Sequence, residues 1–90
     1  MGLSVAKIEI YTSPYCGYCA RAKQLLKSKG VAFAEIDVSM DDAKRTEMMT
    51  RAHGGRSVPQ IFINSQHVGG CDDLYALNSA GKLDPMLAQA

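Results

Sequence analysis

The feature that most constrains the fold is a pair of cysteines, Cys16 and Cys19, placed where a strand pattern gives way to a helix pattern. Residues 5–11 are rich in β-branched side chains and roughly alternate in polarity, which predicts a strand. A polar, proline-containing turn follows, and residues 16–29 then place apolar side chains on one helical face together with Cys19. Because residues 31–38 predict a second strand, we expect a right-handed strand–helix–strand unit with parallel strands.

The rest of the chain completes a small α/β pattern. The 31–38 strand is apolar enough to be buried on both faces of a sheet. Ser39 and Asp42 predict a capping box for a second helix that ends near Gly54. The later elements are expected as a strand at 61–63, a turn at 64–66, a strand from 67, a helix from Asp72 to Gly81, and a short helix within 82–88. The tight turn makes the last two strands an antiparallel hairpin, so we predict one domain, residues 1–90, with a four-stranded mixed sheet flanked by helices in the order βαβαββα.

Composition and charge exclude several classes of protein. The 90 residues suffice for one core, and the formal net charge of +1 argues against nucleic acid or an anionic membrane as a partner. No apolar stretch approaches the roughly 18 residues of a membrane-spanning helix, and the first residues run directly into the strand pattern, so we expect no signal peptide. The 3 cysteines are an odd number, which is atypical of the disulfide frameworks of small secreted proteins. We therefore expect a cytoplasmic protein.

A Cys-x-x-Cys pair has several chemical interpretations. A zinc site needs four ligands, and Cys71, His53 and His67 do not stand at zinc-ribbon or zinc-finger spacing. Covalent haem attachment requires a histidine after the second cysteine, where this chain has Ala20. Two cysteines that only fill space would not explain why they bracket a helix start. A redox dithiol in a strand–helix–strand unit fits the surroundings best.

The helix start assigns different roles to the two thiols. Cys16 is expected at the first helical turn, where backbone N–H groups lack partners and the positive end of the helix dipole favours a thiolate. The thiolate is the attacking species in disulfide exchange, so Cys16 is the predicted nucleophile. Cys19 lies one turn further in and faces the core, which keeps it protonated until it resolves a mixed disulfide on Cys16. Gly17 lets a partner backbone approach, and Tyr18 offers an apolar wall with a polar tip.

Three separated segments carry a resemblance to a known family: Tyr-Cys-Gly-Tyr-Cys at 15–19, Ser-Val-Pro-Gln-Ile-Phe-Ile at 57–63, and Gly-Gly-Cys-Asp-Asp-Leu at 69–74. In this order and spacing they resemble the glutaredoxins, and bacterial-type dithiol glutaredoxins in particular, over nearly the whole chain. The resemblance implies a thioredoxin-like fold and glutathione as a co-substrate, with no tightly bound cofactor.

The resemblance also implies how glutathione is held. The family has a cis peptide bond at Val58–Pro59, which leaves the Val58 N–H and C=O free to pair with the cysteinyl part of glutathione. Gly70 and Cys71 open a helix whose terminal amides bind the γ-glutamyl carboxylate, while Asp72 pairs with the ammonium group. A simple helix N-cap is an alternative role for Asp72 and is compatible with the first.

One position departs from the family pattern. Many glutaredoxins meet the glycine carboxylate of glutathione with a lysine three residues before the nucleophile, where this chain has Ser13. Arg45 matches the other family position for this contact, and Arg56 is near in sequence. The alternative for both arginines is a solvated surface charge without a ligand.

Cys71 lies beside the cleft in the resemblance. We interpret it as a semi-buried residue that fills space, in preference to a site of regulatory oxidation.

These observations predict a monomeric enzyme that reduces protein disulfides and protein–glutathione mixed disulfides. Two alternatives stay open at the level of sequence. Gly17 permits a homodimer that bridges a [2Fe–2S] cluster through one Cys16 from each chain and two glutathiones. Ser13 leaves open a related donor that takes its electrons from thioredoxin reductase.

Overall fold

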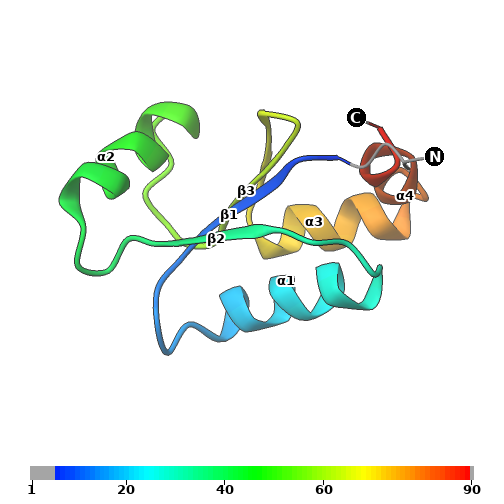
Figure 1. Ribbon diagram of the computed structural model, residues 1–90, viewed down its shortest axis with the longest axis horizontal. Helices are drawn as coiled ribbons and strands as arrows, with labels where there is room; N and C mark the ends of the chain where they lie inside the picture. Colours follow the sequence, from blue (N-terminus) through cyan, green and yellow to red (C-terminus); the bar gives the residue numbers. More distant parts are fainter. Residues whose placement is uncertain (1–5, 90) are drawn as a thin grey trace.

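A computed structural model describes residues 6–89 of the chain as one sheet with helices on both faces. The elements follow in the order β1 (Ile8–Thr12), α1 (Gly17–Ser28), β2 (Ala34–Asp37), α2 (Asp42–Arg51), β3 (Gln60–Ile63), β4 (Gln66–Gly69), α3 (Cys71–Ser79) and α4 (Leu83–Leu87). The strands lie in the order β2-β1-β3-β4, with β1 and β2 parallel and both other pairs antiparallel (Figure 1). The predicted mixed sheet, parallel unit and terminal hairpin are therefore confirmed.

Two hydrophobic clusters follow from the alternation of side chains along the central strands. Ile8 and Ile10 of β1 face a larger cluster that α1, α3 and α4 cover with their leucines. Tyr11 on the same strand faces the opposite side, where it packs with Phe62 of β3 and Met48 of α2. Figure 1 shows α1 and α3 together beneath the sheet, away from α2. Each face is thus closed by its own helices, and none of the helices within residues 6–89 could cross a membrane.

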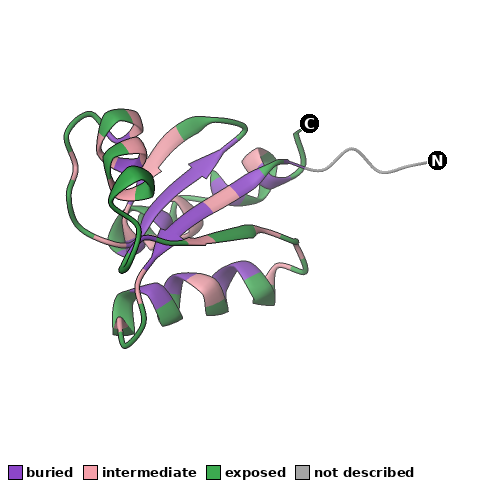
Figure 2. Ribbon diagram, turned by 60° about the vertical axis from the view of Figure 1, so that its left-hand side comes forward, coloured by how far each residue is buried: buried purple, intermediate pink, exposed green. Residues whose placement is uncertain are grey.

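The prediction that the second strand is buried on both faces is wrong. β2 covers only Ala34–Asp37 and lies at the edge of the sheet, because β3 occupies the other side of β1. Glu35 and Asp37 are exposed, and Figure 2 shows β2 mostly outside the purple interior that β1 and β3 form. The apolar residues of the segment divide between the two clusters: Val31 and Phe33 precede the strand and pack against the larger one, while Ile36 and Val38 pack in the smaller one.

The predicted capping box at the start of α2 is also wrong. The N-cap is Asp41, whose carboxylate accepts the Lys44 N–H at 3.0 Å, so Ser39 does not form the expected capping box. The Ser39 N–H instead donates to the Asp37 carboxylate at 2.8 Å in the turn that leaves β2. Other boundaries differ by a few residues: β1 begins at Ile8, β3 at Gln60, β4 at Gln66 and α3 at Cys71, and the expected strand residue Val5 lies outside the described part of the chain.

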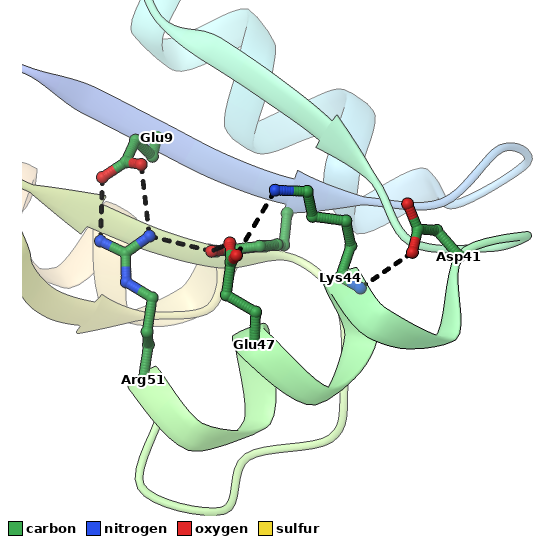
Figure 3. A network of polar contacts seen from close by, with 6 residues as sticks. Glu9, Asp41, Lys44, Glu47 and Arg51 are labelled. Carbon is green, nitrogen blue, oxygen red and sulfur yellow. Dashed lines mark hydrogen bonds and ion pairs between the residues drawn. The ribbon is translucent and has the colours of Figure 1, made fainter.

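A polar network fixes α2 to the sheet. Arg51 donates to both carboxylate oxygens of Glu9, at 2.9 and 3.2 Å, and to the Tyr11 hydroxyl at 2.9 Å (Figure 3). The Tyr11 hydroxyl in turn donates to Glu47. The guanidinium also lies 4.1 Å from the ring centroid of Phe62. We call Glu9, Tyr11, Glu47 and Arg51 the Arg51 network. Because Glu9 and Tyr11 belong to β1, the network ties the helix to a central strand.

Candidate active site

Cys16 lies where β1, after a short turn, leads into α1. It is the N-cap of α1 with an extended backbone, and its Sγ accepts the Cys19 N–H at 3.2 Å. This amide is one of those that the first helical turn leaves without an intrahelical partner, so it stabilises negative charge on the sulfur. Cys16 is half-buried, while Tyr15 before it is fully exposed with a φ of 62°. The sulfur thus combines a stabilising donor with access from solvent.

Cys19 lies one turn into α1 and points into the core. It is 1% exposed, next to Ala22 and Leu26 on the buried face of the helix. Burial, and then the hydrogen bond between the Cys19 and Cys16 side chains, raise the pKa of Cys19 to about 12. The thiol of Cys19 is therefore protonated at neutral pH, as the helical pattern predicted. All three cysteines are free thiols.

A cavity of about 480 Å³ opens beside the dithiol. Six of the residues predicted to hold glutathione line it: Tyr18, Val58, Pro59, Gly70, Cys71 and Asp72. They come from three separate places, the start of α1, the loop before β3, and the start of α3. The Val58–Pro59 peptide bond is cis, as the resemblance implied. The Cys16 Sγ lies 3.9 Å from the Val58 carbonyl oxygen, so the candidate nucleophile contacts a residue of the cavity wall.

The start of α3 forms one wall of this cavity and is capped by a carboxylate of its own first turn. Gly70 is the N-cap, and its N–H donates to the Asp73 carboxylate at 3.0 Å. A Cβ at Gly69 would meet that carboxylate at 2.2 Å, at a φ of +118°, so only glycine fits there. Asp72 does not act as the N-cap and stays exposed, which leaves its carboxylate available to a ligand. Cys71 is buried, and burial raises the pKa of its thiol.

Arg45 is the one predicted glutathione residue that does not line the cavity. Its Nη1 lies 3.5 Å from the Arg56 carbonyl oxygen, in the loop that leads to Ser57 and Val58. Ser13 lines a different cavity, of about 500 Å³, together with Cys16 and Cys19. The two cavities therefore share no lining residue, and they differ in their charged residues.

Sequence reasoning missed five residues that line the candidate glutathione cavity: Ser57, Gln60, His67, Gly69 and Asp73. A usable signal existed for Gln60, which is a polar residue at the start of an apolar strand and is 6% exposed. A residue of this kind needs hydrogen-bond partners, and these partners are in the cavity wall. His67 carried no comparable signal, because its neighbours become apparent only once β3 and β4 are paired.

Comparison with known proteins identifies the family. The glutaredoxin family model matches residues 8–68. Glutaredoxin 3 of Escherichia coli K12 is 58% identical over 83 residues, which cover 92% of this chain and 99% of that protein. The solution structure of a glutaredoxin from Brucella melitensis superposes with a TM-score of 0.82 at 56% identity, covering 94% of this chain and 91% of that one. A buckwheat glutaredoxin–glutathione complex gives a TM-score of 0.83 at 34% identity, covering 94% and 83%. The chain therefore belongs to the glutaredoxin family, with its thioredoxin-like fold and its role as a thiol–disulfide oxidoreductase.

Proposed function

We propose that this protein uses glutathione to reduce protein–glutathione mixed disulfides and protein disulfides, with Cys16 as nucleophile and Cys19 as resolving thiol. The observation that carries the proposal is the cavity beside Cys16, which combines the backbone of Val58, a helix N-terminus and an exposed carboxylate. Glutathione presents a peptide backbone, carboxylates and an ammonium group, so its chemistry matches these three features. The buckwheat relative was solved as a glutathione complex, which further supports the choice of ligand.

The walls of the cavity suggest how each part of glutathione is held. The backbone of Val58 would pair with the cysteinyl residue and bring its sulfur to Cys16, 3.9 Å from the Val58 carbonyl. The first-turn amides of Cys71 and Asp72 lack intrahelical partners and suit the γ-glutamyl carboxylate. The Asp72 carboxylate would pair with the ammonium group. For the glycine carboxylate we propose Arg45, which would have to turn its guanidinium away from the Arg56 carbonyl.

The reaction then follows ordinary thiol–disulfide exchange. The Cys16 thiolate attacks the glutathione sulfur of a mixed disulfide, a Cys16–glutathione disulfide forms, and the protein thiolate leaves and takes up a proton. The thiolate of a second glutathione attacks the bound glutathione sulfur, which releases glutathione disulfide and restores Cys16. With a protein disulfide, Cys16 forms a mixed disulfide with the substrate. Cys19 then loses its proton and attacks the Cys16 sulfur, which forms a Cys16–Cys19 disulfide and releases the reduced substrate. Two glutathione molecules reduce this internal disulfide in turn and leave as glutathione disulfide.

Two serine variants test this assignment. We expect Cys16→Ser to abolish both activities, because no other described thiol combines access with an amide donor. Cys19→Ser should keep reduction of a glutathionylated peptide and lose reduction of a protein disulfide, because only the second reaction needs a resolving thiol. The measurement is turnover of each substrate with glutathione and glutathione reductase. Activity of Cys16→Ser, or equal loss of both activities in Cys19→Ser, would contradict the proposal.

The [2Fe–2S] alternative is not favoured by any feature of residues 6–89. A Cβ added at Gly17 would meet no atom within 4 Å, so the space beside Cys16 is open. Open space permits a second chain to approach but also serves a disulfide substrate. Residues 6–89 contain no group of three or more side chains that could hold a metal ion, so any cluster would depend on ligands from outside the chain.

A further inference from the structure

Three polar side chains form a chain of hydrogen bonds behind the Val58 loop. The Gln60 Nε2 donates to the Ser57 carbonyl oxygen at 3.0 Å and lies 3.5 Å from the Ser57 hydroxyl. The Gln60 Oε1 lies 2.7 Å from the Nε2 of His67 on β4. We call His67, Gln60 and Ser57 the His67 relay. It connects the edge strand of the sheet to the residue directly before Val58.

The Ser57 carbonyl oxygen at one end of the relay fixes the donor and acceptor roles of the other groups. A carbonyl oxygen can only accept, so the Gln60 amide nitrogen must face Ser57 and its oxygen must face His67. The His67 Nε2 must then carry the proton that it donates to Gln60. Gln60 is 6% exposed, so the surrounding atoms leave its amide little room to turn. The orientation of Gln60 therefore depends on the donor that His67 supplies.

The position of the His67 ring is set by its neighbours. It stacks on Phe62 with 5.1 Å between ring centroids and a tilt of 31°, and the His53 ring lies 5.7 Å away. Burial, then the nearby His53, lower the pKa of His67 against an opposing effect of Asp73. The ring is thus neutral at neutral pH, and protonation would add a proton at Nδ1 while Nε2 kept its own. The donation to Gln60 therefore persists in either state.

We propose that His67 and Gln60 are positioning residues for glutathione binding: through Ser57 they hold the Val58 backbone at the distance from Cys16 that the ligand requires. This inference rests on the proposed glutathione function and gives a structural cause for the affinity of the protein for glutathione. Val58 contacts Cys16 with its carbonyl and would contact glutathione with its N–H and C=O. A loop without the relay would sample other orientations, and binding would have to select the productive one. The loss should therefore appear in binding and not in the chemical step.

A matched pair of substitutions at one position separates the donor from the ring. His67→Phe keeps an aromatic ring to stack on Phe62 but has no donor for Gln60. His67→Gln gives up the ring but keeps an N–H donor at similar reach. We expect His67→Phe to raise the apparent KM for a glutathionylated peptide about tenfold, the usual consequence of one buried acceptor left without its donor. The kcat should change by less than twofold. His67→Gln should have a KM close to that of the unmodified protein. Gln66→Leu, on an exposed neighbour in the same strand, is the control for edge-strand effects.

A second variant keeps the test independent of the folding of His67→Phe. Gln60→Met removes the middle of the relay and should raise KM at least as much. Adding His67→Phe to Gln60→Met should then raise KM by less than a further twofold, because both substitutions interrupt the same chain of hydrogen bonds. Equal KM values for His67→Phe and His67→Gln, additive effects in the double variant, or a loss confined to kcat would each overturn the proposal. An unmodified protein that shows no turnover with glutathione would instead refute the proposed function, so the two failures are distinct.

Discussion

The two thiols of the dithiol segment differ in accessibility although they lie one helical turn apart. Cys16 is half-buried and accepts an amide N–H, whereas Cys19 is 1% exposed among apolar side chains. The difference follows from the helical period, because the position three residues after the N-cap rotates back toward the sheet. The same turn thus supplies an attacking thiol that solvent can reach and a resolving thiol that stays protonated.

This difference predicts selective alkylation. With a pKa of about 12, Cys19 has only about one thiolate in ten thousand molecules at pH 8, and its exposed surface is minimal. Iodoacetamide at pH 7 to 9 should therefore label Cys16 and leave Cys19 unmodified, as measured by mass spectrometry of peptides after quenching. Because burial disfavours the charged form, labelling of Cys19 should rise only as the pH approaches its pKa. The Cys16→Ser variant is the control: rapid labelling of Cys19 in it at pH 8 would show that the thiol is not held in the core.

At the scale of elements, α2 is attached to the sheet in a different manner from α1 and α3. Only Met48 of α2 is fully buried, so its apolar contact is small. The Arg51 network supplements this contact, since Arg51 joins the end of the helix to Glu9 and Tyr11 of β1. Its ion pair with Glu9 is sheltered, with side-chain exposures of 25% and 15%. The hydrogen bond from Arg51 lowers the pKa of Glu9, so the carboxylate stays charged.

The Arg51 network predicts a large loss of stability when Arg51 is replaced. Arg51→Met leaves Glu9 and Tyr11 in sheltered positions without their donor, and we expect the free energy of unfolding to fall by about 2 kcal/mol. For a chain of this length, that corresponds to a midpoint lower by about 10 °C in thermal unfolding followed by circular dichroism. Lys44→Met is the matched control on the same helix, because its pair with Glu47 is exposed and should contribute at most about 0.5 kcal/mol. Equal destabilisation by the two variants would contradict a special role for Arg51.

At the scale of the whole molecule, the sequence predicted the features that depend on local pattern. The helix start at Cys16, the parallel unit and the hairpin all follow from periodicity and turn residues. The burial of the 31–38 strand was predicted wrongly, because burial of a strand depends on its place in the sheet, and β3 takes the inner position beside β1. The relay from His67 to Ser57 was not predicted for the same reason: His67 meets Gln60 only when β3 and β4 pair.

The convergence of three distant segments gives the last prediction. Tyr18 at the start of α1, residues 57–60 and residues 69–73 line the cavity of about 480 Å³, whereas the other cavity near the dithiol is lined by Lys23 and Glu35. These two charges already pair with each other at 2.8 Å, so they have little to offer a zwitterionic tripeptide. In a Cys19→Ser variant carrying glutathione on Cys16, amide shifts in nuclear magnetic resonance spectra should change most in those three segments. Changes centred on Lys23, Glu35 and the neighbouring turn would place glutathione in the other cavity and contradict the proposed binding mode.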